Sequence, residues 1–180
     1  MIELGRKQAL MVVKKTEFGV YLGTEDDKVL LPAKYADPDI EEGDSMTVFV
    51  YRDSKDRLIA TTLEPLITLG EVKPLKVKQL TKIGAFMDWG LEKDLLLPFS
   101  EQTSRVEEGR TYPVALYIDK SDRLCATTKI YPYLKTTDAY HTGDGVKGTA
   151  YEYIEKFGMF VAIDNMYPVS YTHLTLPTIL

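Results

Sequence analysis

Asp56-Arg57-Leu58-Ile59-Ala60-Thr61-Thr62 recurs 66 residues later as Asp122-Arg123-Leu124-Cys125-Ala126-Thr127-Thr128. The likeness extends upstream without a gap, so that residues 41–62 and 107–128 are identical at twelve of 22 positions. Unrelated segments of ordinary composition would share about one. The chain therefore contains an internal duplication, which sets the size of its folding unit.

The duplicated units can be given boundaries. Nearer the N-terminus the offset falls to 65, so that Gly19 corresponds to Gly84, and a single inserted residue is typical of a turn. A weaker third copy contains residues 157–161, which correspond to residues 83–87 at an offset of 74. We therefore predict two complete units at 1–66 and 67–134, a linker at 135–144 and a partial third unit at 145–168.

Each unit is predicted to consist of about five short strands. Strand-like stretches such as Ala9–Val13, Val20–Leu22 and Ser45–Asp53 are separated by Gly, Pro and Asp, and no long stretch has the apolar spacing of a helix. A repeat of about 65 residues is longer than the 20 to 45 residues of a solenoid repeat. The predicted fold class is all-β, with tandem five-stranded barrels, two complete and a partial third.

Aromatic residues recur around the glycine of each unit. Phe18 and Tyr21 flank Gly19, and a bulge at this glycine would bring both rings to one outer face as a platform for unpaired bases. The corresponding residues are Phe86, followed by Trp89, in the second unit, and Phe157 with Phe160 in the third. The alternative is that these aromatic side chains belong to the core.

An aspartate four residues before an arginine closes a predicted hairpin in both complete units, as Asp53 with Arg57 and Asp119 with Arg123. The arginine could grip phosphate or stack on a base while the aspartate orients it. Alternatively, the pair is only a salt-bridged hairpin, which contributes little at a surface. The sequence leaves both interpretations open.

Lysines line the first strand of the second unit. The even spacing of Lys76, Lys78 and Lys82 places them on one face, next to Phe86 and Trp89. This basic and aromatic combination makes the second unit the strongest binding candidate, although lysines also protect edge strands from aggregation.

Charge and composition restrict the function. The net charge of −5 argues against binding nucleic acid by bulk electrostatics. It divides into −4, +1 and −2 for residues 1–66, 67–134 and 135–180, so the second unit is the least unfavourable to phosphate. The single Cys125 is expected to be a buried small residue, and no membrane segment is recognisable, so a cytoplasmic protein is predicted.

Catalysis is not predicted. The only histidines, His141 and His173, lie in the linker and the tail, where they cannot assemble a metal cluster or a nucleophile–base pair. Gly143–Gly148 fits a dinucleotide pattern, but it follows a polar linker instead of a strand, so no cofactor is expected.

The series Phe-Gly-x-aromatic, Leu-Leu-Pro, Glu-Glu-Gly and Asp-x-x-x-Arg-Leu resembles the ribosomal protein S-one type of RNA-binding domain, an oligonucleotide-binding (OB) barrel. Its tandem arrangement resembles the conserved virulence factor B family of RNA-binding regulators. The resemblance implies base-stacking roles for the aromatic residues named above, except Trp89, and RNA contacts for the two Asp–Arg pairs. Pro32 and Pro98 stand where the domain type often has a histidine, and Ile83 replaces an aromatic residue, so weak binding per unit is implied.

That family is expected to carry three barrels followed by a winged-helix domain, for which this sequence has no counterpart. Residues 169–180 break the repeat and are predicted to be a non-native tail, the alternative being a natural strand of the third unit. The predicted function is single-stranded RNA binding, linked to translation or to post-transcriptional regulation. The alternative is a non-catalytic scaffold that docks on a ribosome component, a polymerase or a nuclease, and ribosomal or RNA-processing proteins are the predicted protein partners.

Overall fold

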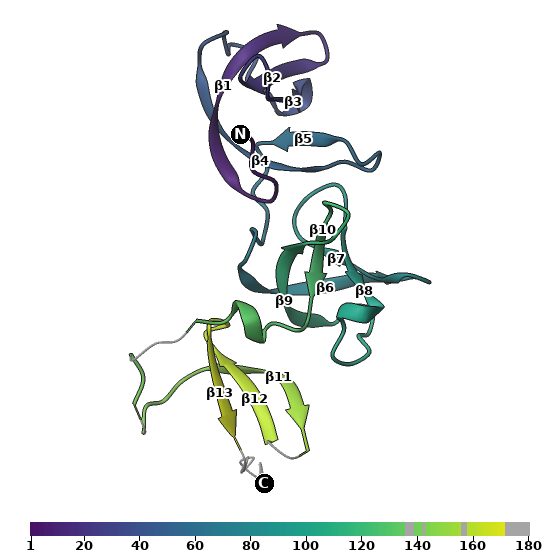
Figure 1. The fold of residues 1–180 in the computed structure, drawn as a ribbon, viewed down its shortest axis with the longest axis vertical. Helices are drawn as coiled ribbons and strands as arrows, with labels where there is room; N and C mark the ends of the chain where they lie inside the picture. Colours follow the sequence, from purple (N-terminus) through teal and green to yellow (C-terminus); the bar gives the residue numbers. More distant parts are fainter. Residues whose placement is uncertain (136–138, 142, 156–157, 172–180) are drawn as a thin grey trace.

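The computed structural model describes residues 1–135, 139–141, 143–155 and 158–171. Throughout that part of the chain the regular structure is β-strand with three short 3-10 turns and no α-helix. Three units follow one another along the longest axis of the molecule (Figure 1). The predicted all-β fold of tandem five-stranded barrels is confirmed.

The first unit, called barrel 1, is a closed barrel. Its strands are hydrogen-bonded in the order β1-β2-β3-β5-β4, and a parallel pairing of Leu30 with Ile59 joins β3 to β5. This is the strand order of an OB barrel. The five strands are β1 (Lys7–Thr16), β2 (Gly19–Gly23), β3 (Lys28–Pro32), β4 (Ser45–Arg52) and β5 (Leu58–Thr61).

The second unit, called barrel 2, repeats this arrangement with the hydrogen-bonded order β10-β9-β6-β7-β8. Strands β8 and β10 lie alongside each other, which leaves the barrel nearly closed. Its strands are β6 (Val72–Leu80), β7 (Gly84–Asp88), β8 (Leu95–Pro98), β9 (Thr111–Ile118) and β10 (Leu124–Thr127), and the 3-10 turn η2 (Phe99–Glu101) follows β8.

The third unit is a three-stranded antiparallel sheet of β11 (Gly148–Ile154), β12 (Gly158–Ile163) and β13 (Tyr167–Tyr171). The backbone pairs Val161 with Val169, so β13 extends beyond residue 168. A small cluster of Val72, Ala115, Ile130 and Ala162 packs this sheet against the outside of barrel 2.

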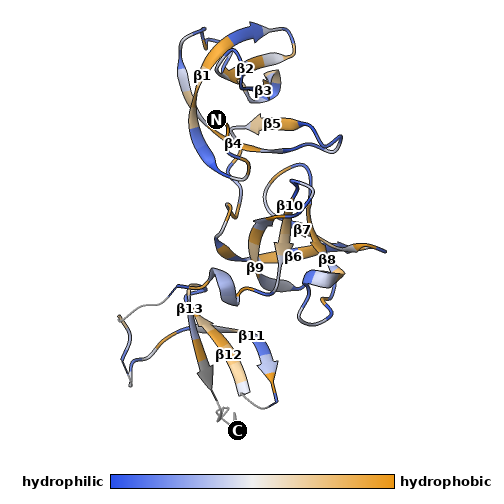
Figure 2. Ribbon diagram, in the orientation of Figure 1, coloured by the Kyte–Doolittle hydropathy of each residue, from blue (hydrophilic) through white to orange (hydrophobic). Residues whose placement is uncertain are grey.

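Each barrel encloses its own apolar core. Hydrophobic residues lie mostly on the strands, while the connecting loops are mostly hydrophilic (Figure 2). Val20 and Leu22 of β2 point into the core of barrel 1, and Ala85 and Met87 of β7 take the same places in barrel 2. Alternate residues of these strands therefore face outward.

Gly19 is required where β2 meets β3. Its φ is +139°, and a Cβ at this position would lie 2.0 Å from the carbonyl oxygen of Leu31. Gly84 is in the same situation, with φ +152° and the Leu97 carbonyl oxygen 2.3 Å from a Cβ. The repeated glycine thus permits close approach of two strands, which a side chain would prevent.

Barrels 1 and 2 share a buried apolar junction. Strand β4 directs Val48 and Val50 into the core of barrel 1, whereas the alternate residues Phe49 and Tyr51 belong to the cluster of barrel 2. There, both rings meet Trp89 edge-on, with centroid distances of 5.8 Å for Phe49 and 6.1 Å for Tyr51. We call Phe49, Tyr51 and Trp89 the inter-barrel cluster.

The connection between the barrels is fixed by backbone hydrogen bonds at two points. The N–H of Leu66 donates to the carbonyl of Trp89 in barrel 2, and the N–H of Leu69 donates to the carbonyl of Gly5 in barrel 1, each at 2.8 Å. Between them, Ile67 is fully buried in the junction. The connector is part of the packed structure, so the two barrels have a defined relative position.

Candidate nucleic-acid interface

One outward aromatic position is common to all three units. The second strand of each unit carries this residue, which is Tyr21, Phe86 or Phe160. Each of the three pairs with the residue that directly follows a register shift in the first strand. All three side chains are partly exposed. The sheet therefore presents one ring at the same place in each unit.

Phe18 lies in the turn between β1 and β2, and its side chain is 74% exposed. The corresponding Ile83 of barrel 2 is also exposed. The predicted bulge at Gly19 is wrong in its position, because β2 pairs regularly with β3 from Gly19 onward and the irregularity lies in β1 between Val12 and Lys14. The turn, and not a strand bulge, exposes the Phe18 ring.

The third unit presents Phe160 beside Tyr151, with ring centroids 6.2 Å apart. The partner of Phe160 in the sequence prediction, Phe157, lies outside the described residues. Glu152 pairs with Phe160 across the strands, where barrel 1 has Lys14 opposite Tyr21. The surroundings of the third ring are therefore more acidic.

The expectation that Trp89 stacks on bases is corrected by its burial. Its side chain is only 2% exposed, because Phe49 and Tyr51 of barrel 1 cover it. Its indole N–H donates to the carbonyl oxygen of Lys93 at 2.5 Å. Sequence spacing placed this residue after β7, but contact with another barrel decides where its ring lies.

Asp119 and Arg123 form a closed hairpin turn between β9 and β10. The carboxylate accepts from the guanidinium of Arg123 at 2.8 and 3.1 Å, and from the backbone N–H groups of Ser121 and Arg123 at 2.8 and 3.0 Å. Asp122 adopts a left-handed conformation with φ +53°, as the extra residue of such a turn does. Asp53 and Arg57 repeat this arrangement between β4 and β5.

The turn stabilises the charged aspartate. Burial alone would raise the pKa of Asp119, but the hydrogen bonds from the backbone and the guanidinium of Arg123, and from the backbone of Ser121, outweigh it, so the pKa lies below its usual value. The pKa of Asp53 is lowered in the same way, against the opposing effect of burial. Both arginine side chains remain more than half exposed, which leaves guanidinium donors accessible.

The two Asp–Arg turns come together at the junction of the barrels. The guanidinium of Arg52 donates to the carbonyl oxygens of Asp56 and Asp122, both at 2.8 Å, and so bridges the two turns. The ammonium of Lys93 donates to the carbonyl oxygen of Asp53 at 2.8 Å. The turns therefore help to hold the barrels together.

The three predicted lysines differ in their surroundings. Lys78 lies in the bulge of β6 and forms an ion pair with Asp94 at 2.7 Å, which raises its pKa. Lys76 pairs with Asp88 across the strands, and Lys82 follows the end of β6 at Leu80. Because Lys82 is outside the strand, the expectation of three lysines on one strand face is wrong.

Barrel 1 has a basic border that the sequence reading overlooked. Lys14 is opposite Tyr21 in the sheet, and the ammonium of Lys28 lies 6.0 Å from the centroid of the Tyr21 ring. This border depends on the register of β1 against β2, because the bulge in β1 decides which lysine lies opposite the Tyr21 ring. Local charge around Tyr21 is therefore positive although residues 1–66 are acidic overall.

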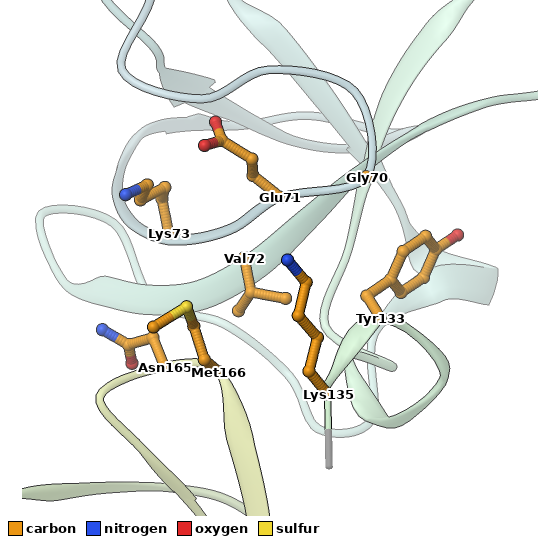
Figure 3. A pocket seen from close by; sticks show the side chains of 8 residues that line it. All are labelled: Gly70, Glu71, Val72, Lys73, Tyr133, Lys135, Asn165 and Met166. Carbon is orange, nitrogen blue, oxygen red and sulfur yellow. The ribbon is translucent and has the colours of Figure 1, made fainter. Parts of the chain in front are cut away.

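A crevice of about 110 Å³ separates barrel 2 from the third sheet (Figure 3). Lys135 extends toward its centre beside Val72, and the Lys135 backbone N–H donates to the carbonyl of Met166 at 2.6 Å. Its lining residues are Gly70, Glu71, Val72, Lys73, Tyr133, Lys135, Asn165 and Met166.

The described residues contain neither a bilayer-spanning helix nor a candidate metal cluster. None of the elements there is a helix with the length and apolar character needed to span a bilayer. The same part of the chain has no group of three or more His, Cys, Asp and Glu residues arranged to hold a metal ion.

Known proteins resemble this chain in sequence and in fold. A protein of Bacillus subtilis (strain 168) named "Uncharacterized protein YitL" is 35% identical over 94 residues, which are 52% of this chain and 32% of that protein. The crystal structure of "a multidomain protein with nucleic acid binding domains" from Streptococcus pneumoniae TIGR4 matches with a TM-score of 0.62 and 19% identity. The match covers 91% of this chain and 60% of that one. This chain thus spans less than two thirds of either relative.

The sequence profile of the S1 domain matches two segments of the chain, residues 4–63 and 69–129. These segments contain the strands of barrels 1 and 2. Together they cover more than half of the sequence, and the chain therefore belongs to the S1 domain family.

Proposed function

We propose that this protein binds single-stranded RNA on the outer surfaces of its two S1 barrels. The observation that carries the proposal is the partly exposed aromatic position shared by Tyr21 and Phe86, each following an exposed residue of the preceding turn. Lys14 lies opposite Tyr21 in the sheet, and Gln79 lies opposite Phe86. Unpaired bases stack on such rings, while lysines neutralise the neighbouring phosphates. Membership of the S1 family and the nucleic acid binding domains named for the Streptococcus pneumoniae structure support this function.

The fixed junction between the barrels adds to the proposal. Once one barrel holds an RNA strand, the second meets the same strand at a high effective concentration. Two weak surfaces in a defined relative position can therefore bind a strand more tightly than either alone. This reconciles RNA binding with the acidic net charge, because affinity would come from stacking and avidity more than from bulk charge.

Fluorescence anisotropy with a labelled 20-nucleotide RNA at low salt tests the proposal. We expect the double variant Tyr21→Ala/Phe86→Ala to bind at least about 30-fold more weakly, because each stacked base contributes about 1–3 kcal/mol. Tyr131→Ala, which removes an exposed ring elsewhere, is the matched control and should bind as the unaltered protein does. Failure of the unaltered protein to bind RNA would refute the proposed function.

The single-stranded preference has its own test. The same RNA annealed to its complement should bind more weakly, because paired bases cannot stack on an exposed ring. The slope of affinity against salt concentration then reports how many phosphates are neutralised, and few are expected here. Equal affinity for the duplex would refute the preference for unpaired bases while leaving nucleic-acid binding in place.

We further propose that RNA binding serves translation or post-transcriptional regulation. Ribosomal or RNA-processing proteins that depend on RNA for association should be lost from an affinity-purified sample after nuclease treatment. A partner retained after nuclease treatment would instead support direct docking of proteins on the barrels.

A further inference from the structure

Barrel 2 has an open groove beside the turn that joins β6 to β7. It encloses about 630 Å³ between Leu80, at the end of β6, and the segment from η2 to the start of β9. Its lining residues are Leu80, Phe99, Gln102, Thr103, Ser104, Arg105 and Val106. No sequence motif predicted this site.

The groove combines the groups that an unpaired nucleotide requires. The Phe99 side chain is 52% exposed and the Leu80 side chain 43%, so an aromatic ring and an aliphatic surface are both accessible. Arg105 is exposed and, among the described residues, has no ion pair. A ring for stacking and a guanidinium for phosphate are thus available in one place.

Hydrogen bonds fix the loop that forms the far wall. The backbone N–H of Thr103 donates to the hydroxyl of Thr128 at 2.8 Å, and the backbone N–H of Gln102 donates to the carbonyl of Phe99 at 3.2 Å. The side-chain amide of Gln102 donates to the carbonyl of Leu97 at 3.2 Å. A preformed wall reduces the entropy cost of binding.

Barrel 1 provides an internal comparison, because the same place is occupied there. Lys15 corresponds to Leu80, and its ammonium donates to the carbonyls of Pro38 at 2.8 Å and Ile40 at 3.1 Å. This lysine ties the first strand to the loop that corresponds to the groove wall. The shorter, apolar Leu80 cannot make these bonds, which accounts for the open groove in barrel 2.

The two copies also differ in chemistry at the groove. Phe99 and Arg105 of barrel 2 correspond to Ala33 and Asp39 of barrel 1, so barrel 2 gains a ring and exchanges a negative charge for a positive one. Both changes favour RNA.

The groove continues the proposed RNA surface. Phe86 and Leu96 are paired across β7 and β8, Gly84 and Pro98 follow as the next outward pair, and Phe99 comes directly after Pro98. Phe99 therefore lies close to the end of the strand pair that carries Phe86, and one RNA strand that stacks on Phe86 needs to extend only past this end to meet Phe99.

We propose that this groove binds one further unpaired nucleotide of the RNA, with its base on Phe99 and its phosphate at Arg105. The inference rests on the proposed RNA-binding function and extends it, since it assigns to barrel 2 a subsite that barrel 1 lacks.

Direct evidence would come from a fluorescent reporter in the groove. Trp89 is the chain's only tryptophan and is buried, so Phe99→Trp introduces a single surface indole. Added RNA should quench this new emission, and the quenching should saturate at the concentration found by anisotropy. RNA that binds without changing the emission would overturn the subsite.

Affinity measurements give an independent readout. We expect Phe99→Ala/Arg105→Ala to weaken RNA binding about five- to 100-fold, as loss of one stacked base does. Leu80→Lys/Arg105→Asp, which transfers the residues of barrel 1, should close the groove and cause a similar loss. The control Ala33→Ser/Asp39→Ala, at the matching places in barrel 1, should not weaken binding.

The outcomes separate the two proposals. If the unaltered protein does not bind RNA, the proposed function fails. If it binds RNA with undiminished affinity after Phe99→Ala/Arg105→Ala, and circular dichroism shows that the variant is folded, the groove subsite is wrong while the RNA-binding function stands.

Discussion

Replacement of Trp89 by alanine should destabilise the protein by about 4 kcal/mol and leave its RNA-contacting surface in place. The ring is almost completely buried, and burial of about 150–250 Å² at roughly 25 cal/mol per Å² gives an upper limit near 4–6 kcal/mol. Typical losses for Trp or Phe to Ala in a core are about 3–5 kcal/mol. The carbonyl of Lys93, which loses its donor, adds to the cost.

Guanidinium unfolding followed by far-ultraviolet circular dichroism would measure this loss. Phe18→Ala is the matched control, because it removes an exposed ring and should change the stability by less than about 0.5 kcal/mol. We expect the opposite order for RNA affinity, with Phe18→Ala weakening binding and Trp89→Ala leaving the folded protein able to bind. A loss below about 1 kcal/mol in Trp89→Ala would refute the buried position.

The same experiment reports on coupling between the barrels. Phe49→Ala removes the partner ring from barrel 1 and should destabilise the protein without adding its full cost to that of Trp89→Ala. An interaction energy of about 0.5–1.5 kcal/mol is expected from an edge-on aromatic pair. Strict additivity of the two losses would mean that the rings do not interact across the junction.

Three further outcomes can be measured. Gly19→Ala should lower the unfolding free energy by more than about 2 kcal/mol, and far more than Gly43→Ala. Both glycines have a positive φ, but only at Gly19 would a Cβ meet a backbone oxygen. Equal losses of stability in urea titrations would contradict this. The pKa of Asp119 is lowered in the folded protein, so the charged carboxylate stabilises the fold above its unfolded pKa near 4, and this stabilisation is lost as the pH falls through the folded pKa. The stability of Asp119→Asn should therefore fall less steeply than that of the unaltered protein below about pH 4. An unchanged pH dependence of the unfolding midpoint would contradict this. Burial raises the pKa of Cys125 to about 11, so at pH 8 a thiol reagent should modify it slowly in the folded protein and rapidly in urea, whereas similar rates would exclude a protected thiol.

Much of the fold could be predicted from the sequence because its determinants are local and occur twice. Apolar stretches between turn residues define the strands, and the repeat supplies the number of strands in each unit. The Asp–Arg turn was recognised because all its hydrogen bonds lie within five residues, from Asp119 to Arg123. Such features depend on neighbours in the chain, which a sequence displays directly.

The predictions that were wrong depend on contacts between distant segments. Burial of Trp89 requires β4 of the other barrel, and its own surroundings in the sequence give no sign of that contact. A signal existed in the partner strand, where Val48-Phe49-Val50-Tyr51 is apolar at every position. A strand of this kind is buried on both faces and needs a second neighbour. The sequence also gives no sign of where the bulge in β1 lies, and this position decides which lysine lies opposite Tyr21.

The internal repeat separates structural residues from candidate binding residues. The Asp–Arg turn and the close-approach glycine occur in both barrels with the same geometry, which their contributions to hairpin and strand packing explain without any ligand. Repetition alone therefore does not identify a binding residue. The more informative positions are exposed ones where the barrels differ while the scaffold stays the same, as Phe99 differs from Ala33. On this reasoning, the two barrels would contribute unequally to RNA binding, and the bound RNA would have a preferred direction across the two barrels.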